Sequence, residues 1–335
     1  MQNAQFFKDN LFSINAQNFE EYALSLFRWQ AEHNPVYKLY IENLSIRVEE
    51  VKRLEHIPFL PIAFFKDHKV VSIDETEKTE SYTYYESSGT TGQQRSRHYL
   101  ADTEFYLKVC RQIFETQYGK LEDFHVFALL PSYLERKHAS LVAMADHFIQ
   151  LSQSDLSGFY LNEYDRLLAQ IQEAKKTGRK VLLLGVTFAL LELAENYSPK
   201  LEGVIVMETG GMKGRRKEMI RQELHYILTN GFQLNHIHSE YGMTELLSQA
   251  YAHYKGLFQC PSWMRVLIRD INDPFCLDQS LRYGGINVID LANVHSCAFI
   301  ETQDLGRYHH ETGYFEVLGR FDQSDVRGCN LMVAL

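Results

Sequence analysis

Four short apolar runs in the middle of the chain alternate with stretches of helical length, and this pattern constrains the fold more than any other feature. The runs are "HVFALL" at 125–130, "KVLLLG" at 180–185, "GVIVME" at 203–208 and "LNHIHS" at 234–239. Between them lie amphipathic stretches such as "NEYDRLLAQIQEAKKTG" and "GRRKEMIRQELHYILTNG". The alternation predicts an α/β fold with a mainly parallel sheet and helices on both faces. Ligands of such sheets collect at the carboxyl ends of the strands.

The two ends of the chain follow other patterns. Residues 17–55 predict helices, because apolar side chains such as Phe19, Ala23 and Phe27 recur at helical spacing. The stretch "EHIPFLPIAFFKDHKVVS" then suits an extended segment packed on a core. From about residue 260, segments such as "GGINVIDLAN" and "GYFEVLGR" predict the antiparallel strands of a small β subdomain. We expect one domain over residues 1–335, with a helical part over about 1–80, an α/β core over 81–255 and a β-rich part over 256–335.

The overall charge limits the classes of binding partner that we expect for the chain. The 335 residues contain 34 Lys and Arg against 43 Asp and Glu, for a net charge of -9. An acidic surface disfavours a broad grip on nucleic acid or anionic membrane, so any bound polyanion should be small and held locally. The sequence has no apolar run of about 18 residues and no basic start followed by an apolar core, so we expect no membrane span and a cytoplasmic location.

The cysteines are five, widely scattered and never arranged as CxxC: Cys110, Cys260, Cys276, Cys297 and Cys329. That distribution argues against a disulfide framework or a zinc site and favours reduced thiols.

A loop rich in small polar residues lies in "YYESSGTTGQQRSRHYL", residues 84–100. Its Ser88, Gly89, Thr90, Thr91 and Gly92 offer hydroxyls and unobstructed backbone amides, which suit a phosphate. The loop follows neither the GxxxxGK[ST] nor the GxGxxG pattern. Taken alone, it fits an ordinary polar turn equally well.

A second motif, "SEYGMTE" at 239–245, is expected to end a strand and open a helix. This position would place Tyr241, Gly242, Thr244 and Glu245 at the carboxyl-end crevice. An aromatic ring there can face a base, a hydroxyl can bind phosphate and a carboxylate can bind magnesium.

Two further stretches add to that crevice. In "METGGMKGRR", Gly210 and Gly211 permit close approach of a flat ligand to the backbone. In "ETQDLGR" and "LGRFD", Asp304 is an acceptor suited to a pair of ribose hydroxyls and Arg320 comes from the next strand end.

These stretches, in this order, resemble the motifs that surround ATP in the adenylate-forming superfamily. The chain is more closely similar to the acyl-protein synthetase family of the LuxE type, which activates long-chain fatty acids for bacterial bioluminescence reductases. The closer match is carried by "IPFLPIAFFKDHKV", "LLPSYLERKHASLVAMADHFI", "ETGGMKGRRKEM" and "VLGRFDQSDVRGCNLMV", and it spans residue 20 or so to the end.

The resemblance implies a role for each motif in binding ATP and Mg²⁺. Residues 88–92 would be a mobile loop that closes over the β- and γ-phosphates, and the Gly210–Gly211 pair would lie against the nucleotide. The remaining implied roles are Tyr241 stacked on adenine, Thr244 on the α-phosphate, Glu245 on Mg²⁺, and Asp304 with Arg320 on the ribose. The carboxylate of an acyl substrate would attack the α-phosphorus, releasing pyrophosphate and leaving an acyl adenylate.

The resemblance also implies an acyl site and an acyl acceptor. The stretch "LLPSYLERKHASLV" would line the acyl side, with Tyr133 and His138 near the carboxylate. Cys329 resembles the family's covalent acyl acceptor, and a thiolate near Arg327 could attack the mixed anhydride to give a thioester. A small buried hydrophobe is the equally weighted alternative for Cys329. The expected partners are a carboxylic acid, with a fatty acid favoured, and an acyl-acceptor protein such as a reductase or a carrier protein.

Several alternatives stay open from the sequence. Typical adenylate-forming enzymes continue into a small mobile C-terminal domain that supplies a lysine to the adenylation step, and this chain stops at Leu335, so that domain is expected to be absent. An acyl- or aryl-CoA ligase of the phenylacetate-ligase type and a non-catalytic nucleotide- or acyl-binding module are the competing functions. His98 and Asp102 have the HxxxD spacing of some acyltransferases, and the His236–His238 pair could meet on a metal, but both patterns are weak.

Overall fold

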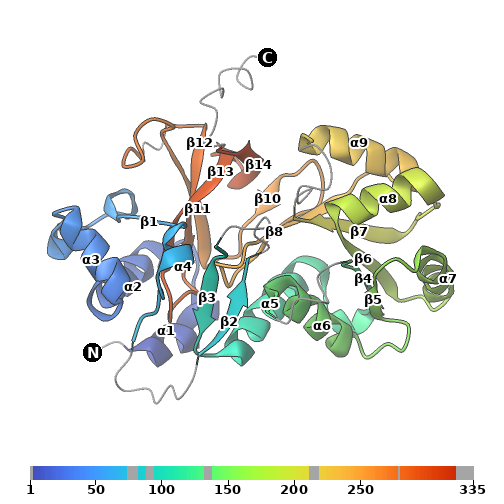
Figure 1. The fold of residues 1–335 in the computed structure, drawn as a ribbon, viewed down its shortest axis with the longest axis horizontal. Helices are drawn as coiled ribbons and strands as arrows, with labels where there is room; N and C mark the ends of the chain where they lie inside the picture. The colour runs from blue at the N-terminus through green and yellow to red at the C-terminus, as the bar shows by residue number, and fades with distance from the viewer. Residues whose placement is uncertain are drawn as a thin grey trace.

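The computed structural model describes residues 3–73, 82–87, 94–131, 138–210, 219–277 and 280–321 (Figure 1). Within these ranges one large sheet of 12 strands runs through the molecule. Along its main path the strands are, in order, β11 (Met264–Arg269), β12 (Tyr283–Asp290), β13 (Phe299–His309), β14 (Tyr314–Arg320), β10 (Phe258–Gln259), β9 (Ala250–Ala252), β8 (His238–Tyr241), β7 (Val204–Thr209), β6 (Lys180–Val186), β4 (Phe124–Leu129) and β5 (Gly158–Tyr160). The short strand β1 (Leu60–Pro61) pairs in parallel with β13 off this path.

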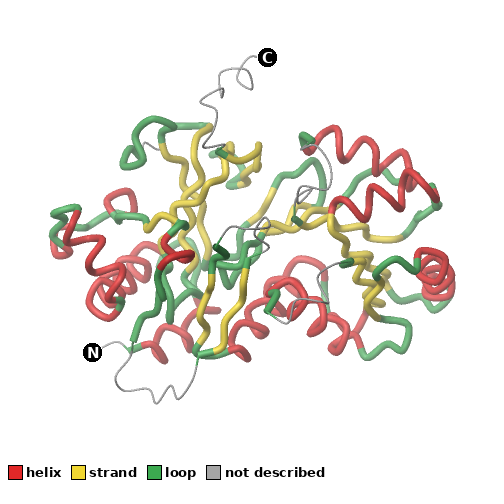
Figure 2. Tube along the Cα trace, viewed as in Figure 1, coloured by secondary structure: helices red, strands yellow, loops and turns green. Residues whose placement is uncertain are grey.

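The half of the sheet from β8 to β5 is parallel. Five helices flank it: α5 (Thr103–Tyr118), α6 (Ser140–Ser152), α7 (Tyr164–Lys175), α8 (Thr187–Tyr197) and α9 (Arg221–Phe232). Figures 1 and 2 show α7, α8 and α9 on one face and α5 and α6 on the other. Because both faces are covered, every residue of β4 is buried, which is why this strand has a continuous apolar sequence.

The other half of the sheet, from β9 to β11, is antiparallel. The N-terminal helices α1 (Ala4–Asn10), α2 (Phe19–His33) and α3 (Pro35–Asn43) lie beside this half (Figure 1). Gln30 of α2 ties the two together, since its amide nitrogen donates to the Asn293 carbonyl at 2.8 Å and its oxygen accepts from the Ala298 amide at 2.9 Å. Short helical turns complete this region and the core: η1 (Leu11–Ser13), η2 (Val48–Glu50), η3 (Leu54–His56), α4 (Phe64–Asp67) and η4 (Leu121–Asp123).

Local capping explains where the helices begin. Asn34 accepts a hydrogen bond from the Tyr37 amide at 3.1 Å, and Pro35 occupies the first turn of α3, where its missing amide costs nothing. Asp102 caps α5 in the same way through the Phe105 amide at 2.8 Å, and α5 ends at Gly119, whose φ of 96° favours glycine.

A separate two-stranded hairpin, β2 (Thr83–Glu86) with β3 (Arg97–Leu100), lies across the junction of the two halves (Figure 1). Its pairing is antiparallel, with Glu86 opposite Arg97 and Tyr85 opposite His98. Residues 88–93 at its tip lie outside the described residues.

The expected α/β class is confirmed, with a mainly parallel half, flanking helices and antiparallel strands in the C-terminal third. The antiparallel strands continue the main sheet by hydrogen bonding rather than forming a sheet of their own. The stretch around residues 55–72 is extended apart from the single turns η3 and α4. No helix within the described ranges has the length and apolar character needed to cross a membrane.

Two local predictions were wrong. The strand expected at 234–239 forms instead at His238–Tyr241, where it pairs with Met207–Thr209 of β7. The helix expected after "SEYGMTE" is absent, and residues 242–249 form a loop that leads into β9. The physical reason is that the Leu247 and Ser248 amides donate to the buried Asp290 carboxylate, at 2.9 and 2.8 Å, instead of to the carbonyls of a helix.

Candidate functional site

Three predicted site residues meet at the junction between the two halves of the sheet. The Tyr241 hydroxyl donates to Asp304 Oδ2 at 2.9 Å, and Arg320 Nε donates to Asp304 Oδ1 at 3.2 Å. They come from β8, β13 and β14, and Asp304 lies directly opposite Arg320 in the ladder. Folding therefore gathers side chains that are up to 79 positions apart in the sequence, from Tyr241 to Arg320.

The members of this cluster differ in burial, from the protein interior at Asp304 to solvent at Arg320. Asp304 is 6% exposed, whereas the Arg320 side chain is 74% exposed. Burial and the Asp304 carboxylate together raise the pKa of Tyr241 well above its ordinary value, so this hydroxyl stays a hydrogen-bond donor. The Tyr241 ring packs edge-on against Phe315 at a centroid distance of 5.4 Å. The cluster thus presents a buried carboxylate beside an exposed cation.

Glu245 lies behind the hairpin and connects it to the cluster. Glu245 is 5% exposed, and its carboxyl group lies within hydrogen-bonding reach of the Ser96 side chain. Burial raises the pKa of Glu245, and the hydrogen bond with Ser96 and the charge of Arg320 oppose that rise only in part. A buried carboxyl group with too little positive charge around it is suited to bind a cation.

The hairpin brings the flanks of the Ser/Thr/Gly loop to Glu245. The Ser87 amide donates to the Ser96 carbonyl at 3.0 Å, and the Ser96 amide donates to Ser87 Oγ at 3.0 Å. The loop residues Ser88, Gly89, Thr90, Thr91 and Gly92 themselves lie outside the described residues. The described flanks, Ser87 and Ser96, contact each other, and Ser96 lies beside Glu245.

The 241–245 segment is held from several sides. His98 Nδ1 lies 2.8 Å from the Thr244 carbonyl, and burial lowers the pKa of His98 to about 4, so the neutral ring donates this hydrogen bond. Thr244 is half-buried, and Gly242 is exposed. A Cβ at Gly242 would come too close to the Glu240 carboxyl group, so a larger residue here requires that buried side chain to move.

Asp290 and Asn293 are positioning residues that the sequence reasoning missed. The Asp290 carboxylate accepts from the Leu247 and Ser248 amides and from Ser248 Oγ at 2.6 Å. Asn293 Nδ2 donates to the Glu245 carbonyl at 2.9 Å. A signal was present in "VIDLANV", residues 288–294, where an Asp and an Asn interrupt an otherwise apolar run.

Two buried acids at the ends of the parallel strands were also missed. Glu208 on β7 forms an ion pair with Arg221, and its carboxylate lies 3.5 Å from His225 Nε2. Burial raises the pKa of Glu208, but the charge of Arg221 and hydrogen bonds from its other neighbours outweigh burial and lower it below the ordinary value. Glu240 on β8 is 7% exposed and accepts from the Thr209 hydroxyl, and burial raises its pKa to about 7.

The structure describes some of the other predicted residues, namely Gly210 of the glycine pair and His138 of the acyl side. Gly210 ends β7 with a φ of 72°, and its carbonyl accepts from Thr187 Oγ1 at 2.6 Å. His138 stacks on Tyr84 of the hairpin at 4.4 Å between ring centroids, and its carbonyl accepts from the Glu86 amide. The predicted residues Gly211, Tyr133, Arg327 and Cys329 lie outside the described residues.

The weaker patterns have structural explanations. Asp102 caps α5 and accepts from Lys8 Nζ at 2.6 Å, while His98 faces the Thr244 carbonyl, so the HxxxD pair serves two different contacts. The rings of His236 and His238 lie 5.0 Å apart, but no group of three or more possible metal ligands occurs among the residues that the structure describes. Cys110 and Cys297 are free and buried in the core.

The fold is shared with solved structures of ligases. The sequence matches no protein-family model and no curated protein significantly. A 2-hydroxyisobutyryl-CoA ligase in complex with 2-HIB-AMP and CoA is similar with a TM-score of 0.65 and 15% identity, over 94% of this chain and 71% of that one. The same ligase in the postadenylation state with 2-HIB-AMP gives a TM-score of 0.62 and 13% identity, over 94% of this chain and 70% of that one.

An ATP-bound RpMatB-BxBclM chimera gives a TM-score of 0.54 and 18% identity, over 74% of this chain. This chain covers 50% of the chimera's length. At such identities the likeness shows the fold alone, which this chain shares with the 2-hydroxyisobutyryl-CoA ligase and the chimera.

Proposed function

We propose that this protein activates a carboxylic acid with ATP as an acyl adenylate and transfers the acyl group to a protein thiol. The observation that carries the proposal is the meeting of Tyr241 and Arg320, at the ends of β8 and β14, with Asp304 in the middle of β13 and with Glu245 behind them. A fatty acid is the proposed substrate because the sequence resembles enzymes that activate such acids.

Each member of the cluster has a chemical role in this proposal. The Asp304 carboxylate is held by Tyr241 and Arg320, and its remaining lone pairs can accept from the two hydroxyls of a ribose. The Arg320 side chain is 74% exposed, so its guanidinium group can also donate to a phosphate bound beside Asp304. Thr244, Gly210 and Gly242 lie at the strand ends where a nucleotide can approach the backbone.

Mg²⁺ fits Glu245 on the chemistry of its surroundings. The Glu245 carboxyl group is buried and has a raised pKa, so a bound cation would supply the missing positive charge. One protein carboxylate with phosphate oxygens and water is an ordinary Mg²⁺ environment. When bound, the ion would offset the negative charge of the phosphates.

The proposed chemistry has two balanced steps. A carboxylate oxygen of the acid attacks the α-phosphorus of ATP, the bond from that phosphorus to the bridging oxygen breaks, and diphosphate leaves. The thiolate of Cys329 then attacks the acyl carbon, the bond from that carbon to the AMP oxygen breaks, and a thioester and AMP result. A reductase or carrier protein is the proposed final acceptor.

The direct test is exchange of labelled diphosphate into ATP with a panel of carboxylic acids. We expect exchange with at least one acid, loss of exchange in Asp304→Ala, and unchanged exchange in the control Lys175→Ala on α7. Binding of ATP with no exchange for any acid would instead identify a non-catalytic nucleotide-binding module.

The transfer step is tested by mass spectrometry after incubation with ATP, Mg²⁺ and mixed fatty acids. We expect a covalent acyl adduct in the wild type that disappears in Cys329→Ser while exchange persists. An adduct retained in Cys329→Ser removes this cysteine from the mechanism.

An acyl-CoA ligase is the second candidate function, favoured by the fold shared with the ligase that was crystallised with 2-HIB-AMP and CoA. It predicts acid-dependent turnover of CoA without a protein adduct. Measuring acyl-CoA and acyl-protein in the same reaction separates the two.

A further inference from the structure

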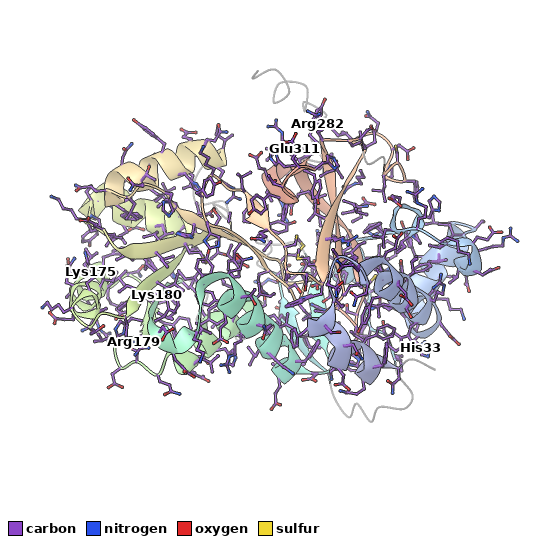
Figure 3. All side chains as sticks on the ribbon, turned by 180° about the vertical axis from the view of Figure 1, so that it is seen from behind. His33, Lys175, Arg179, Lys180, Arg282 and Glu311 are labelled. Carbon is purple, nitrogen blue, oxygen red and sulfur yellow. The ribbon has the colours of Figure 1, made fainter. Side chains whose placement is uncertain are left out.

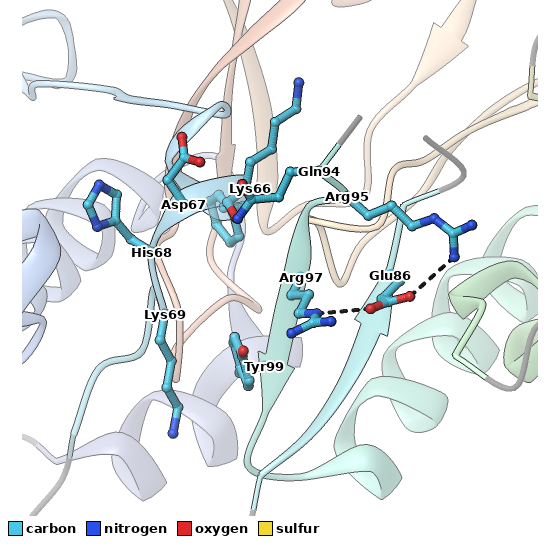
Figure 4. Close-up of a pocket in the computed structure, with 10 residues that line it drawn as sticks. Lys66, Asp67, His68, Lys69, Glu86, Gln94, Arg95, Arg97 and Tyr99 are labelled. Carbon is cyan, nitrogen blue, oxygen red and sulfur yellow. Dashed lines mark hydrogen bonds and ion pairs between the residues drawn. The ribbon is translucent and has the colours of Figure 1, made fainter. Parts of the chain in front are cut away.

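A polar cavity of about 530 Å³ lies between residues 65–69 and the outward face of the β2–β3 hairpin (Figure 4). Side chains alternate along the strand and its approach, so Arg95 and Arg97 point outward while Ser96 and His98 are buried on the opposite side. Lys66 and Lys69 line the cavity from the other wall. The cavity lies outside the Tyr241–Asp304–Arg320 cluster and plays no part in the proposed nucleotide contacts.

The charge of this cavity is opposite to that of the chain. Four Lys and Arg side chains line it against two carboxylates, Asp67 and Glu86, although the chain carries a net charge of -9. Among the described residues, no ion pair or hydrogen bond involves the Lys66 ammonium group, which Figure 4 shows extended away from Glu86. A local basic cavity on an acidic protein concentrates small anions.

The two arginines of the cavity, Arg95 and Arg97, already stabilise one negative charge, that of Glu86. Glu86 accepts from Arg97 Nε at 2.9 Å and from Arg95 at 3.4 Å, and Figure 4 shows both guanidinium groups turned toward it. Partial burial raises the pKa of Glu86, but the hydrogen bonds and charges of Arg97 and Arg95 outweigh it and lower the pKa below its ordinary value. Two guanidinium groups that converge on one carboxylate can likewise donate charge-assisted hydrogen bonds to the oxygens of a phosphate.

The cavity is close to the proposed reaction site. Gln94 Nε2 donates to the Lys66 carbonyl at 2.7 Å and fixes the hairpin to the opposite wall. Phe65 in that wall packs edge-on against the His98 ring at 5.8 Å, and His98 contacts the Thr244 carbonyl. A single buried side chain therefore separates the cavity wall from the segment that carries Thr244.

We propose that this cavity binds diphosphate, the leaving group of the proposed adenylation, on Arg97, Arg95 and Lys66. The inference rests on the proposed function for its ligand. The two guanidinium groups bind the phosphate oxygens in competition with Glu86, and Lys66 contributes its free positive charge from the opposite wall.

Isothermal titration calorimetry of the full chain with sodium diphosphate, without ATP or acid, tests the proposal. Arg97→Ala should weaken binding about tenfold, because it removes a charge-assisted hydrogen bond to the ligand. Glu86→Gln should tighten binding several-fold, because it removes the competing carboxylate. Lys175→Ala is the matched control, since Lys175 is an exposed lysine of α7, at one end of the molecule in Figure 3. Thermal unfolding verifies that each variant is folded.

The two proposals fail in different ways. Diphosphate binding that depends on Arg97 without any exchange activity supports this site and refutes the adenylation proposal. Binding that is lost in Arg320→Ala but kept in Arg97→Ala places the anion at the nucleotide cluster and overturns the inference. An affinity that neither Arg97→Ala nor Glu86→Gln changes overturns it as well.

Discussion

Glu240 should make the stability of this protein fall as the pH rises. Its carboxyl group is buried at the end of β8, accepts from the Thr209 hydroxyl and has the charged Glu208 nearby. Burial, opposed by the Thr209 hydrogen bond and aided by Glu208, raises the pKa of Glu240 from 4.5 to about 7. Between these values the folded protein holds a proton that the unfolded chain has released.

The size of the effect follows from that shift. The free energy of unfolding should decrease by roughly 1.4 kcal/mol per pH unit between 4.5 and about 7, or about 3 kcal/mol in total. The contribution of Glu240 is fully present below pH 4.5 and is lost as the pH rises through the folded-state pKa. Glutamine has nearly the shape of the protonated acid and does not titrate, so Glu240→Gln removes this dependence.

Urea unfolding of the wild type and Glu240→Gln at pH 5, 6, 7 and 8 measures the difference. Titrations common to both proteins cancel, and we expect the variant to be the more stable of the two at pH 8, by up to about 3 kcal/mol. Glu173→Gln, on the exposed surface of α7, is the control for removing one carboxylate. A stability difference between wild type and Glu240→Gln that stays constant from pH 5 to 8, or grows in the opposite direction, refutes the reasoning.

Three further changes test other contacts. Arg221→Ala leaves Glu208 buried without its cation and should lower the free energy of unfolding by about 3 kcal/mol in urea; a loss under about 1 kcal/mol contradicts this. Gly242→Ala introduces a clash with the Glu240 carboxyl group and should reduce diphosphate exchange about tenfold while the protein stays folded by circular dichroism, whereas full exchange would show that the loop shifts freely. Asp304→Ala should weaken ATP binding about tenfold in calorimetry, and an unchanged affinity would remove Asp304 from the ribose role.

The parallel strands could be predicted well because they are buried on both faces. The runs at 125–130, 180–185 and 203–208 each lie within one residue of the observed strands β4, β6 and β7. Strand β8 was misplaced because Ser239 and Glu240 are polar and yet buried, and their burial depends on partners in β7 and β9 that no local pattern reveals.

The polar motifs of the candidate site could be predicted from the sequence, but the residues that hold those motifs in position could not. Tyr241, Asp304 and Arg320 stand out because they follow or end apolar segments. Asp290 and Asn293 hold the segment from more than 40 positions away, as the Leu247–Asp290 hydrogen bond illustrates. These long-range hydrogen bonds replace the local hydrogen bonds of a helix at residues 247–248. A prediction from neighbouring residues alone therefore favoured a helix.

The pairing of β1 with β13 means that the N-terminal part of the fold can form its contacts with the sheet only late in synthesis. Leu60 pairs with Ile300, and the Gln30 side chain bonds to the backbone of Asn293 and Ala298. The N-terminal segment therefore lacks these partners in β13 and its preceding loop until some 240 further residues have been synthesised. The apolar side chains that pack on β13, such as Phe27 and Tyr37, lack that partner during this interval, so we expect the nascent N-terminal segment to bind chaperones and its truncated products to aggregate.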